Sequence, residues 1–432
     1  MSANFDLSNE AREAFGKIKN LRERGREEMG QDPKRSAYLP SPDDASRPVH
    51  LVMQGGGTLG IAHLGFVRGL EAAGLRFAGL AGTSAGAIIS LLIACARASD
   101  PDQEVSGRLL PLLLAMPTNS FMDGPFHARR LVKYALNPRG ASILEYVLPA
   151  VTAWHRLVND HGLHRGDRFM EWLQRTLEKE FGVITVLDLR GHLDNIAGKL
   201  GFGERGEEFL HIVATAMPMG LKMVFPRHAN LFHLRYLQHS PAVWARASMS
   251  VPLFFEPFQM DLNADRWNEF VDDLKGHYPE QIISDLRSLK ELHFIDGGLL
   301  SNFPIDAFSQ LGRPNASATS AIETIGVALV PGSRNSVAVG NRGSTRTLLR
   351  HAAAVAGAVR HSRDYEALER SHMQARLDPS SPETQVVFID TGEHNWLNFS
   401  LDQDAMEDLY LRGLRTCAAF LEKVCKLKAT VR

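Results

Sequence analysis

Hydrophobic and polar residues alternate along the N-terminal third of the chain in a pattern that predicts strands and helices in turn. The apolar, β-branched run 49–53 is typical of a buried strand, and apolar residues recur at helical spacing over 61–70. A second short apolar run at 76–82 predicts another strand, and residues 85–96, apolar on nearly every side, predict a buried helix. This alternation is typical of an α/β protein with a parallel sheet.

Further segments extend the pattern towards the C-terminus. Four of them resemble sheet strands: 208–217, 230–237, 323–330 and 384–391. Helical patterns fill four longer stretches: 100–182, 263–292, 343–376 and 402–426. A turn is expected at 184–190, where the chain returns to the sheet. The chain is therefore predicted to fold as an α/β protein with a central, mostly parallel sheet and helical insertions.

The N-terminal residues are set apart by their charge. Residues 9–36 show a charged helical pattern, and a stretch rich in Pro and Ser follows at 39–48. We expect this arm to pack outside the sheet. The predicted organisation has three parts: an arm with its linker (1–47), a main domain that contains the helical insertion at 100–182 (48–392), and a C-terminal helix packed on that domain (393–432).

The composition is that of a globular protein without a net electrostatic preference. Hydrophobic residues make up 44% of the chain, and 48 basic side chains balance 49 acidic ones. This balance gives no general attraction to nucleic acid, so no nucleic-acid partner is expected. Cys95, Cys417 and Cys425 are the only cysteines, too few and too scattered for a disulfide framework or a zinc site. No metal and no cofactor are expected.

No segment of the sequence has the length of a membrane-spanning helix. The apolar run 85–96 has twelve residues, whereas a bilayer crossing needs about twenty. The N-terminal residues 1–15 lack the basic start, apolar middle and small-residue cleavage site of a secretory signal. The protein is therefore expected to be soluble and cytoplasmic.

Ser84 has the sequence context of a catalytic nucleophile. It is flanked by Gly82 and Gly86 at the spacing G-x-S-x-G, between a predicted strand and the apolar helix. This is the spacing of a nucleophile elbow, in which the serine lies on a strained strand-to-helix turn and a Cβ at either flank would collide with neighbouring backbone. The pattern predicts a nucleophilic serine.

A glycine-rich loop, residues 55–60 (GGGTLG), lies between the first predicted strand and the first predicted helix. Backbone N–H groups of such a loop can stabilise an oxyanion. Gly55, Gly57 and Gly60 also fit the dinucleotide pattern G-x-G-x-x-G. The acidic residue expected about twenty positions later is missing, however, and the second strand runs into Ser84 instead. The loop is therefore interpreted as an oxyanion loop.

A serine nucleophile needs a base, and the sequence offers two kinds. The first kind is a histidine of the later chain. The candidates are His351, His361, His372 and His394. None of these histidines lies in a short motif that would position it. The second kind is Asp296, which ends a β-rich run and is followed by Gly297 and Gly298, so that its carboxylate can face a neighbouring strand end closely.

Three motifs, in this order, resemble those of the patatin-like phospholipase family. They are GGGTLG at 55–60, the elbow GTSAG at 82–86 and DGGLLSNFP at 296–304. A fourth stretch, ARASMSVPLFFEPF at 245–258, is similar to the segment that the family places before its aspartate motif. Three separated motifs in the family's order are much more specific than any one of them.

The resemblance implies a three-layer α/β fold and a Ser/Asp catalytic dyad. Ser84 would be the nucleophile and Asp296 the base. Backbone N–H groups of Gly55, Gly56 and Gly57 would form the oxyanion hole, Gly56 and Gly57 above all. The remaining motif glycines would shape the elbow and the turns: Gly60, Gly82, Gly86, Gly297 and Gly298.

The implied activity is the hydrolysis of fatty acyl esters, as in a phospholipase A. Ser84 would attack the ester carbonyl, Asp296 would accept the hydroxyl proton, and water would then release the fatty acid from the acyl-enzyme. The expected partner is a membrane phospholipid or another lipid ester, met at the membrane surface. Leu59 stands where the family often carries a basic residue, and the missing charge weakens the case for a phospholipid over a neutral ester.

Other functions on the same fold remain open. The same acyl-enzyme would serve a neutral lipid esterase, a thioesterase or an acyltransferase. A non-catalytic lipid-binding signalling module would keep the fold without the chemistry. A regulatory ligand or protein activator would act through the N-terminal arm or the helices after residue 343. Within the insertion, the apolar and basic residues of 121–132 suit either an interfacial lid or an ordinary core.

Overall fold

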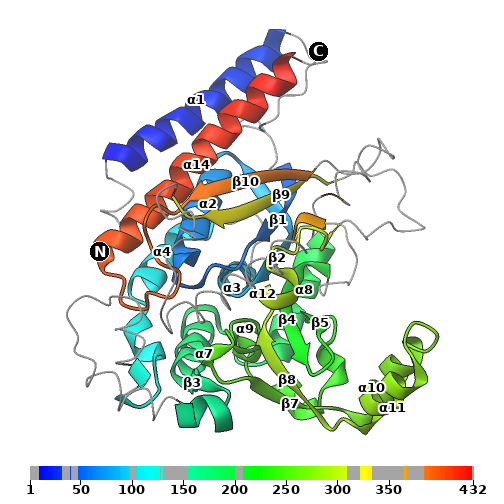
Figure 1. The fold of residues 1–432 in the computed structure, drawn as a ribbon. Coiled ribbons are helices and arrows are strands. Elements are labelled where there is room, and N and C mark those ends of the chain that lie inside the picture. Colours follow the sequence, from blue (N-terminus) through cyan, green and yellow to red (C-terminus); the bar gives the residue numbers. More distant parts are fainter. Residues whose placement is uncertain are drawn as a thin grey trace.

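An eight-stranded sheet with helices packed against it forms the centre of the computed structural model (Figure 1). The α/β class with a central, mostly parallel sheet, predicted from the sequence, is confirmed. The structure describes residues 9–31, 39, 47–97, 104–126, 128–129, 154–199, 208–308, 322–332, 364–366, 369 and 384–430.

The strands form a large sheet and a small one. Their bounds are β1 Arg47–Met53, β2 Leu75–Thr83, β3 Gly162–His164, β4 Leu210–Met217, β5 Leu221–Phe225, β6 Leu253–Phe255, β7 Phe258–Asp261, β8 Glu291–Asp296, β9 Thr324–Val330 and β10 Thr384–Asp390. Strands β10, β9, β1, β2 and β4 are neighbours in that order and run parallel. Strands β5 and β8 pair antiparallel with β4, and β7 pairs antiparallel with β8. Strands β3 and β6 form the small sheet.

The helices alternate with these strands. The α-helices are α1 Asn9–Gln31, α2 Ile61–Ala72, α3 Ala85–Ala96, α4 Ser106–Leu114, α7 Asp167–Phe181, α8 Val186–Lys199, α9 Ala242–Ser248, α10 Ala264–Asp273, α11 Glu280–Ser288, α12 Gly298–Ser301 and α14 Gln403–Thr430. Short 3₁₀ helices are η1 Gly57–Gly60, η2 Thr118–Phe121, η4 Ala229–Leu231 and η5 Leu234–Gln238. The predicted helix at 85–96 has the same bounds as α3.

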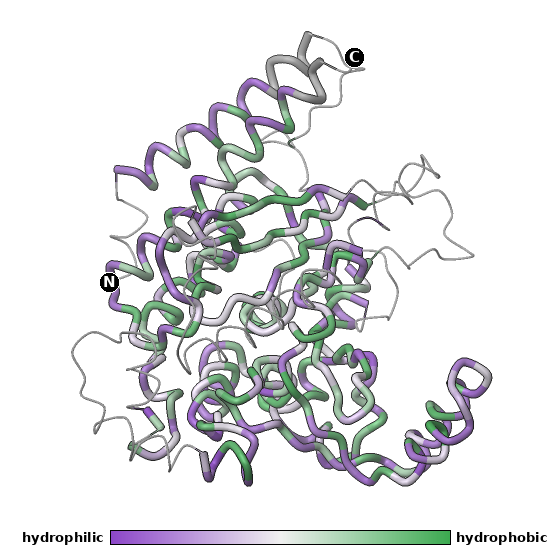
Figure 2. Tube along the Cα trace, viewed as in Figure 1, coloured by the Kyte–Doolittle hydropathy of each residue, from purple (hydrophilic) through white to green (hydrophobic). Residues whose placement is uncertain are grey.

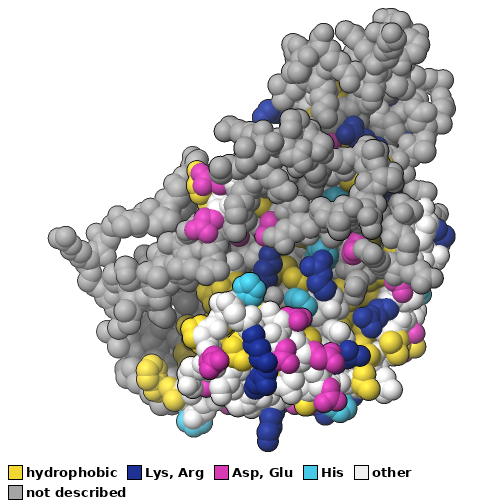
Figure 3. Space-filling view, turned by 90° about the vertical axis from the view of Figure 1, so that its right-hand side faces the viewer, with side chains coloured by type: hydrophobic (Ala, Val, Ile, Leu, Met, Phe, Trp, Pro, Cys, Tyr) yellow, Lys and Arg dark blue, Asp and Glu magenta, His cyan; other side chains and the backbone are white. Residues whose placement is uncertain are grey.

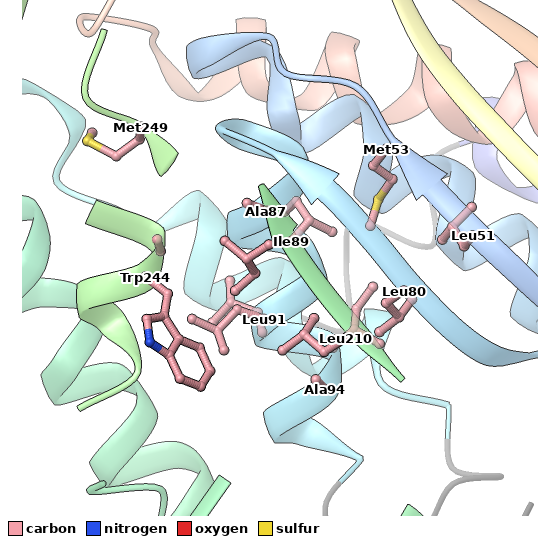
Figure 4. Packing of buried hydrophobic residues seen from close by; sticks show 14 of the residues in the cluster. Leu51, Met53, Leu80, Ala87, Ile89, Leu91, Ala94, Leu210, Trp244 and Met249 are labelled. Carbon is pink, nitrogen blue, oxygen red and sulfur yellow. The ribbon is translucent and has the colours of Figure 1, made fainter. Parts of the chain in front are cut away.

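The parallel strands send alternate side chains to two apolar layers. Leu51 and Met53 of β1 belong to the larger core, which includes residues of α2, α3 and α14, whereas Val52 belongs to a smaller cluster with Phe303 and Phe308. The two-residue period of a strand produces this separation. Figure 4 shows the larger core from close by, where α3 side chains fill the space between the sheet and α9.

The charged N-terminal arm forms α1, which lies along α14 outside the sheet (Figure 1). Its Ala11, Ala14 and Ile18 are buried, and purple and green alternate along both helices in Figure 2 because each has one apolar and one polar side. Arg415 of α14 bonds Glu10 of α1 at 2.6 Å. The arm is therefore attached to the C-terminal helix, which packs on α2.

One predicted strand is wrong. Residues 230–237 form parts of η4 and η5 instead of a strand. In a strand with one buried face, neighbouring side chains would not both be buried, but Leu231 and Phe232 are. The segment has no partner strand, since Phe232 makes only an isolated bridge with Leu262. The His233 side chain accepts a hydrogen bond from Arg235 N, which starts η5.

Some predicted features fall outside the described residues. They are most of the helix at 343–376 and most of the linker at 39–48.

Within the insertion, Phe121 is buried, with its ring edge-on to Phe169 at 5.3 Å between centroids. Phe121 therefore belongs to an ordinary core, whereas residues 130–132 of the proposed lid lie outside the described residues. Phe126, by contrast, is 61% exposed.

The surface agrees with the balanced composition. Figure 3 shows basic and acidic side chains interspersed over the described part of one face. Among the described residues, no helix combines the length and the apolar character that crossing a bilayer requires.

Candidate active site

The turn around Ser84 has the geometry of a nucleophile elbow. Ser84 joins β2 to α3 with φ 51° and ψ −117°, a strained conformation for a residue with a side chain, costing on the order of 1–3 kcal/mol. A Cβ at Gly82 would collide with the backbone of Gly86, and a Cβ at Gly86 would collide with the carbonyl of Met53. The two glycines let the turn close against β1, and they leave the serine at the carboxyl end of β2.

Strands β2 and β8 approach one another head-on along β4. Strand β2 runs parallel to β4 and ends with Thr83 opposite Val213, whereas β8 runs antiparallel and ends with Asp296 opposite Ala214. Strand β5 pairs with the other edge of β4, so β2 and β8 share one edge. Because consecutive strand residues are only about 3.3 Å apart, the carboxyl ends of β2 and β8 face each other closely. Ser84 directly follows β2 at this point.

The turn after Asp296 is built to keep the two strand ends close. A Cβ at Gly297 would collide with the carbonyl of Val213 and would lie 3.0 Å from the Thr83 side chain. Gly298 N donates to Asp296 Oδ1 at 2.7 Å, which fixes the carboxylate. Ser84 and Asp296 are 5% and 3% exposed, so both act in surroundings largely shielded from water.

The glycine loop is held beside Ser84 through Asn302. Gly55 N donates to the Asn302 carbonyl at 2.9 Å, and Asn302 Nδ2 donates to the Gly55 carbonyl at 3.4 Å. A Cβ at Gly55 would lie 2.5 Å from Asn302 Oδ1 and 3.3 Å from Ser84 Cβ. The loop therefore approaches the serine as closely as backbone permits, and the Gly55 N–H is already engaged.

The next two N–H groups of the loop have no such partner. Among the described residues, no backbone or side-chain group accepts from Gly56 N or Gly57 N. Gly57 has φ +55°, which favours glycine, and a Cβ at Gly56 would collide with the Leu329 side chain. A Cβ at Gly60 would lie 3.0 Å from Ala85 Cβ, so this glycine lets η1 pack on the start of α3.

Two cavities meet at this loop. The first has a volume of about 250 Å³ and brings together the predicted nucleophile, base and oxyanion-loop glycines; its walls are Gln54, Gly55, Gly56, Gly57, Leu59, Ser84, Asp296, Asn302, Leu329, Pro331, Thr391, His394 and Trp396. The second has about 40 Å³ and is mainly apolar; its walls are Gly57, Thr58, Gly60, Ile61, Ala85, Ile88, Ile89, Leu113, Met116, Thr118, Leu401 and Met406. Gly57 lines both cavities and so stands between them.

Ser248, at the end of α9, holds the nucleophile turn in place. Its Oγ accepts from Ser84 N at 2.8 Å and donates to the Val213 carbonyl at 2.6 Å. Its own carbonyl accepts from Gly297 N at 3.3 Å. Ser248 thus connects the elbow with the turn after Asp296. The sequence did not single it out, although it lies in the stretch 245–258 that resembled the family.

We expect Ser248→Ala to lower kcat about tenfold or more, because the elbow loses the contact that fixes its position. The buried Ser84 N–H and Val213 carbonyl would also lose a partner, at about 1–3 kcal/mol of unfolding free energy. Ester hydrolysis and urea unfolding measure the two effects. The control is Ser90→Ala on α3, whose buried hydroxyl has no partner among the described residues. Equal kcat in the two variants would contradict a positioning role.

A segment after β10 closes the site. Thr391, His394 and Trp396 line the larger cavity, and the Trp396 carbonyl accepts from Thr58 N at 3.0 Å and from Thr58 Oγ1 at 3.1 Å. A Cβ at Gly57 would collide with this same carbonyl. The C-terminal part of the chain therefore supports the glycine loop. No motif in the sequence pointed to Trp396.

Of the four late histidines, His394 lies in the described part of the chain and lines the cavity with Ser84. Its Nε2 is 2.9 Å from Asp408 Oδ2. The other three fall outside the described residues: His351, His361 and His372.

A buried histidine supports the start of the glycine loop. His63 Nε2 lies 2.8 Å from the Gln54 carbonyl, and the ring is fully buried on α2. Burial lowers the pKa of His63 to about 4, although the Gln54 hydrogen bond works in the opposite direction. The ring is therefore neutral at pH 7 and donates to the carbonyl. Gln54 Oε1 in turn accepts from Leu329 N at 2.9 Å, which ties the loop to β9.

Side chains that bind metals do not gather in the described residues. No group of three or more His, Cys, Asp or Glu side chains there is arranged to hold an ion. Cys95 and Cys417 are free and buried, and burial raises the pKa of both thiols, so they pack as small apolar side chains.

A serine elbow on an α/β sheet, beside a glycine loop and facing a carboxylate, is the arrangement of serine-dependent acyl hydrolases. A model of the family described as patatin-like phospholipase matches residues 51–309, and the chain belongs to this family. The resemblance inferred from the three motifs is thus confirmed.

Two individual proteins are similar to the chain. The uncharacterized protein YqhO of Bacillus subtilis (strain 168) is 26% identical over 377 residues, which cover 86% of this chain and 97% of YqhO. The crystal structure of VipD from Legionella pneumophila matches 92% of this chain and 73% of VipD, with 14% identity and a TM-score of 0.37.

Proposed function

We propose that this protein is a serine-dependent lipid acyl hydrolase of the phospholipase A type, with Ser84 as nucleophile and Asp296 as base. One observation carries the proposal: β2 and β8 end opposite consecutive residues of β4, and both ends open into one cavity. The family, whose members are typically lipid acyl hydrolases, supports a lipid ester as substrate.

The proposed reaction has two steps. In the first, Ser84 Oγ attacks the ester carbonyl, its proton passes to the Asp296 carboxylate, and the alcohol leaves with that proton. In the second, a water gives a proton to Asp296 and attacks the acyl-enzyme, and the fatty acid is released as Asp296 returns that proton to Ser84 Oγ. The same carboxylate therefore serves as base and acid in turn.

Gly56 and Gly57 are the proposed oxyanion donors. Their N–H groups lack described partners, whereas Gly55 N is occupied by Asn302, so Gly55 contributes by shape and not by donation. A single oxyanion donor is typically worth about a hundred- to a thousandfold in kcat. Two donors would supply a large part of the rate that a carboxylate base alone does not provide.

The apolar cavity beyond Gly57, about 40 Å³, is the proposed binding site for the first methylene groups of the acyl chain. It adjoins the elbow through Ala85 and the loop through Gly57, and its other walls include Ile88, Ile89 and Met116. An acyl chain bound there would bury methylene groups at about 0.8 kcal/mol each. This would favour a fatty acyl ester over an acetyl ester.

We expect Ile88→Trp to lower kcat/KM for a long-chain p-nitrophenyl ester about tenfold relative to the acetyl ester. The larger side chain would fill the apolar cavity and exclude about two methylene groups. Ile88 is only half-buried, so the change is tolerable for the fold. Ile184→Trp is the control, because Ile184 is exposed and lines neither cavity. An unaltered preference in Ile88→Trp would place the acyl chain elsewhere.

The substrate class is tested by mass-spectrometric profiling of total lipids incubated with the wild-type protein and with Ser84→Ala. Release of fatty acid and lysophospholipid by the wild type alone supports a phospholipase. Release of fatty acid from neutral lipids alone supports a neutral lipid esterase, the alternative that Leu59 favours. No acyl release from any lipid would contradict both.

We also propose a regulatory role for the arm, which we assign to residues 1–47 beside a catalytic domain at 48–392 and a C-terminal helix at 393–432. Helix α1 packs on α14, and the residues just before α14 support the glycine loop. A ligand or protein activator that moves the arm would thus reach the oxyanion donors through α14.

A further inference from the structure

His394 brings the second chargeable group into the catalytic cavity. Among its described wall residues, Asp296 and His394 are the two whose side chains can carry a charge. The His394 side chain is 23% exposed, so it is reached from the cavity. It lies beyond the residues that the family model matches, which end at 309.

The His394 ring is held by a carboxylate that is itself fixed. Asp408 Oδ2 accepts from His394 Nε2 at 2.9 Å and from Arg412 Nε at 2.7 Å. Burial raises the pKa of Asp408, but the hydrogen bonds and charges of Arg412 and His394 together lower it by more than burial raises it. The pKa of Asp408 is therefore below its usual range, and the group is ionised. The second ring nitrogen, His394 Nδ1, has no partner among the described residues.

The backbone around His394 is anchored on both sides. Before it, Thr391 N donates to the Val330 carbonyl at 2.9 Å, which attaches the segment to the end of β9. After it, the Trp396 carbonyl accepts from Thr58 of the glycine loop. The imidazole is therefore a built part of the cavity wall and not a mobile surface group.

The two cavities would hold different parts of a bound ester. With its carbonyl at Gly56 and Gly57, the acyl chain would enter the apolar cavity, and the alcohol portion would lie in the larger cavity with His394. That cavity, about 250 Å³, is smaller than the roughly 300–1,000 Å³ of small-molecule sites. It accommodates the groups next to the scissile bond and not a whole lipid.

We propose that His394, held by Asp408, binds an anionic oxygen in the alcohol portion of the substrate and so selects esters with a phosphate close to the scissile bond, as in glycerophospholipids. The inference rests on the proposed function. An anionic group entering beside Asp296 needs a compensating donor. On taking up a proton, His394 donates from Nε2 to Asp408 and from Nδ1 to the phosphate.

The test compares two soluble esters that share their acyl chains, dihexanoyl phosphatidylglycerol and dihexanoylglycerol. In the wild type, kcat/KM should favour the phospholipid. His394→Gln should reduce this preference about tenfold, mainly through KM, because one charge-assisted hydrogen bond is lost. His394→Lys, which keeps a cation, should retain more of the preference than His394→Gln.

The matched control is His293→Gln. His293 pairs with Glu291 at 3.1 Å, as His394 pairs with Asp408, but it does not line the cavity. A preference that is the same in His394→Gln and in the control overturns the proposal. Equal loss on both esters also overturns it and assigns His394 to proton transfer instead.

Two further measurements, inhibition by phosphate compounds and fluorophosphonate labelling, distinguish this proposal from related explanations. sn-Glycerol 3-phosphate should inhibit the wild type more than His394→Gln, whereas equally strong inhibition by inorganic phosphate would indicate a site for free phosphate and overturn the assignment to lipid. Failure of the proposed function would give a different result: a fluorophosphonate would not label the wild-type protein at Ser84. The inference fails on its own when the protein is labelled but the preference is unchanged.

Discussion

Ser84→Ala is expected to lower kcat for acyl release by about ten thousand- to a millionfold, the range seen when a catalytic nucleophile is removed. The variant lacks the oxygen that attacks the ester, so no acyl-enzyme forms. The fold should persist, because alanine keeps the Cβ and meets the φ of 51° at Ser84 with the same strain that serine already bears. Fatty acid release and fluorophosphonate labelling report the loss.

The control for this variant is again Ser90→Ala, six positions along α3 and outside both cavities. It should be labelled and active like the wild type, and thermal unfolding should show all three proteins folded. Acyl release by Ser84→Ala within a hundredfold of the wild type would mean that another residue is the nucleophile.

Asp296→Asn is expected to lower kcat about a hundred- to ten-thousandfold, the usual contribution of a general base. The amide oxygen still accepts the hydrogen bond that Gly298 N now gives to Asp296 Oδ1, so the turn should keep its shape. What the variant loses is the ability to accept a proton from Ser84. Steady-state kinetics and the rate of fluorophosphonate labelling both measure that ability.

The matched control is Asp306→Asn, the next aspartate along the chain, which pairs with Lys222 at 3.3 Å and does not line the cavity. Labelling of Asp296→Asn at the wild-type rate would rule out this carboxylate as the base. If His394→Ala were then as inactive as Ser84→Ala, His394 would take that role, and the Ser/Asp dyad would be replaced by a triad with Asp408.

The local pattern of residues predicted the strand-turn-helix order around both motifs. The apolar run 85–96 became α3 because it is buried against the sheet and α9, and the run at 76–82 became part of β2. The prediction failed at 230–237, where alternating apolar residues form 3₁₀ turns. Alternation signals a strand only where a partner strand is present, and pairing is a property of distant segments.

The tertiary structure alone showed which groups surround the motifs. Ser248 contributes a hydroxyl to the elbow, and the Trp396 carbonyl supports the loop, but neither residue stands in a pattern that marks such a contact. A carbonyl is common to every residue, so its use depends on where the backbone passes. His394 was one of four equivalent histidines until the fold placed it on the cavity wall.

The sequence by itself determined the chemistry that is available: a serine between glycines, an aspartate before two glycines, and a loop able to offer its amides. The spacing of the glycines is informative because several of them stand where a Cβ would collide with neighbouring backbone, as at Gly82, Gly86 and Gly297. Only the tertiary structure decided that the serine and the aspartate meet, since their approach depends on the register of β2 and β8 on β4. Register is set by long-range strand pairing, which no local pattern of residues specifies.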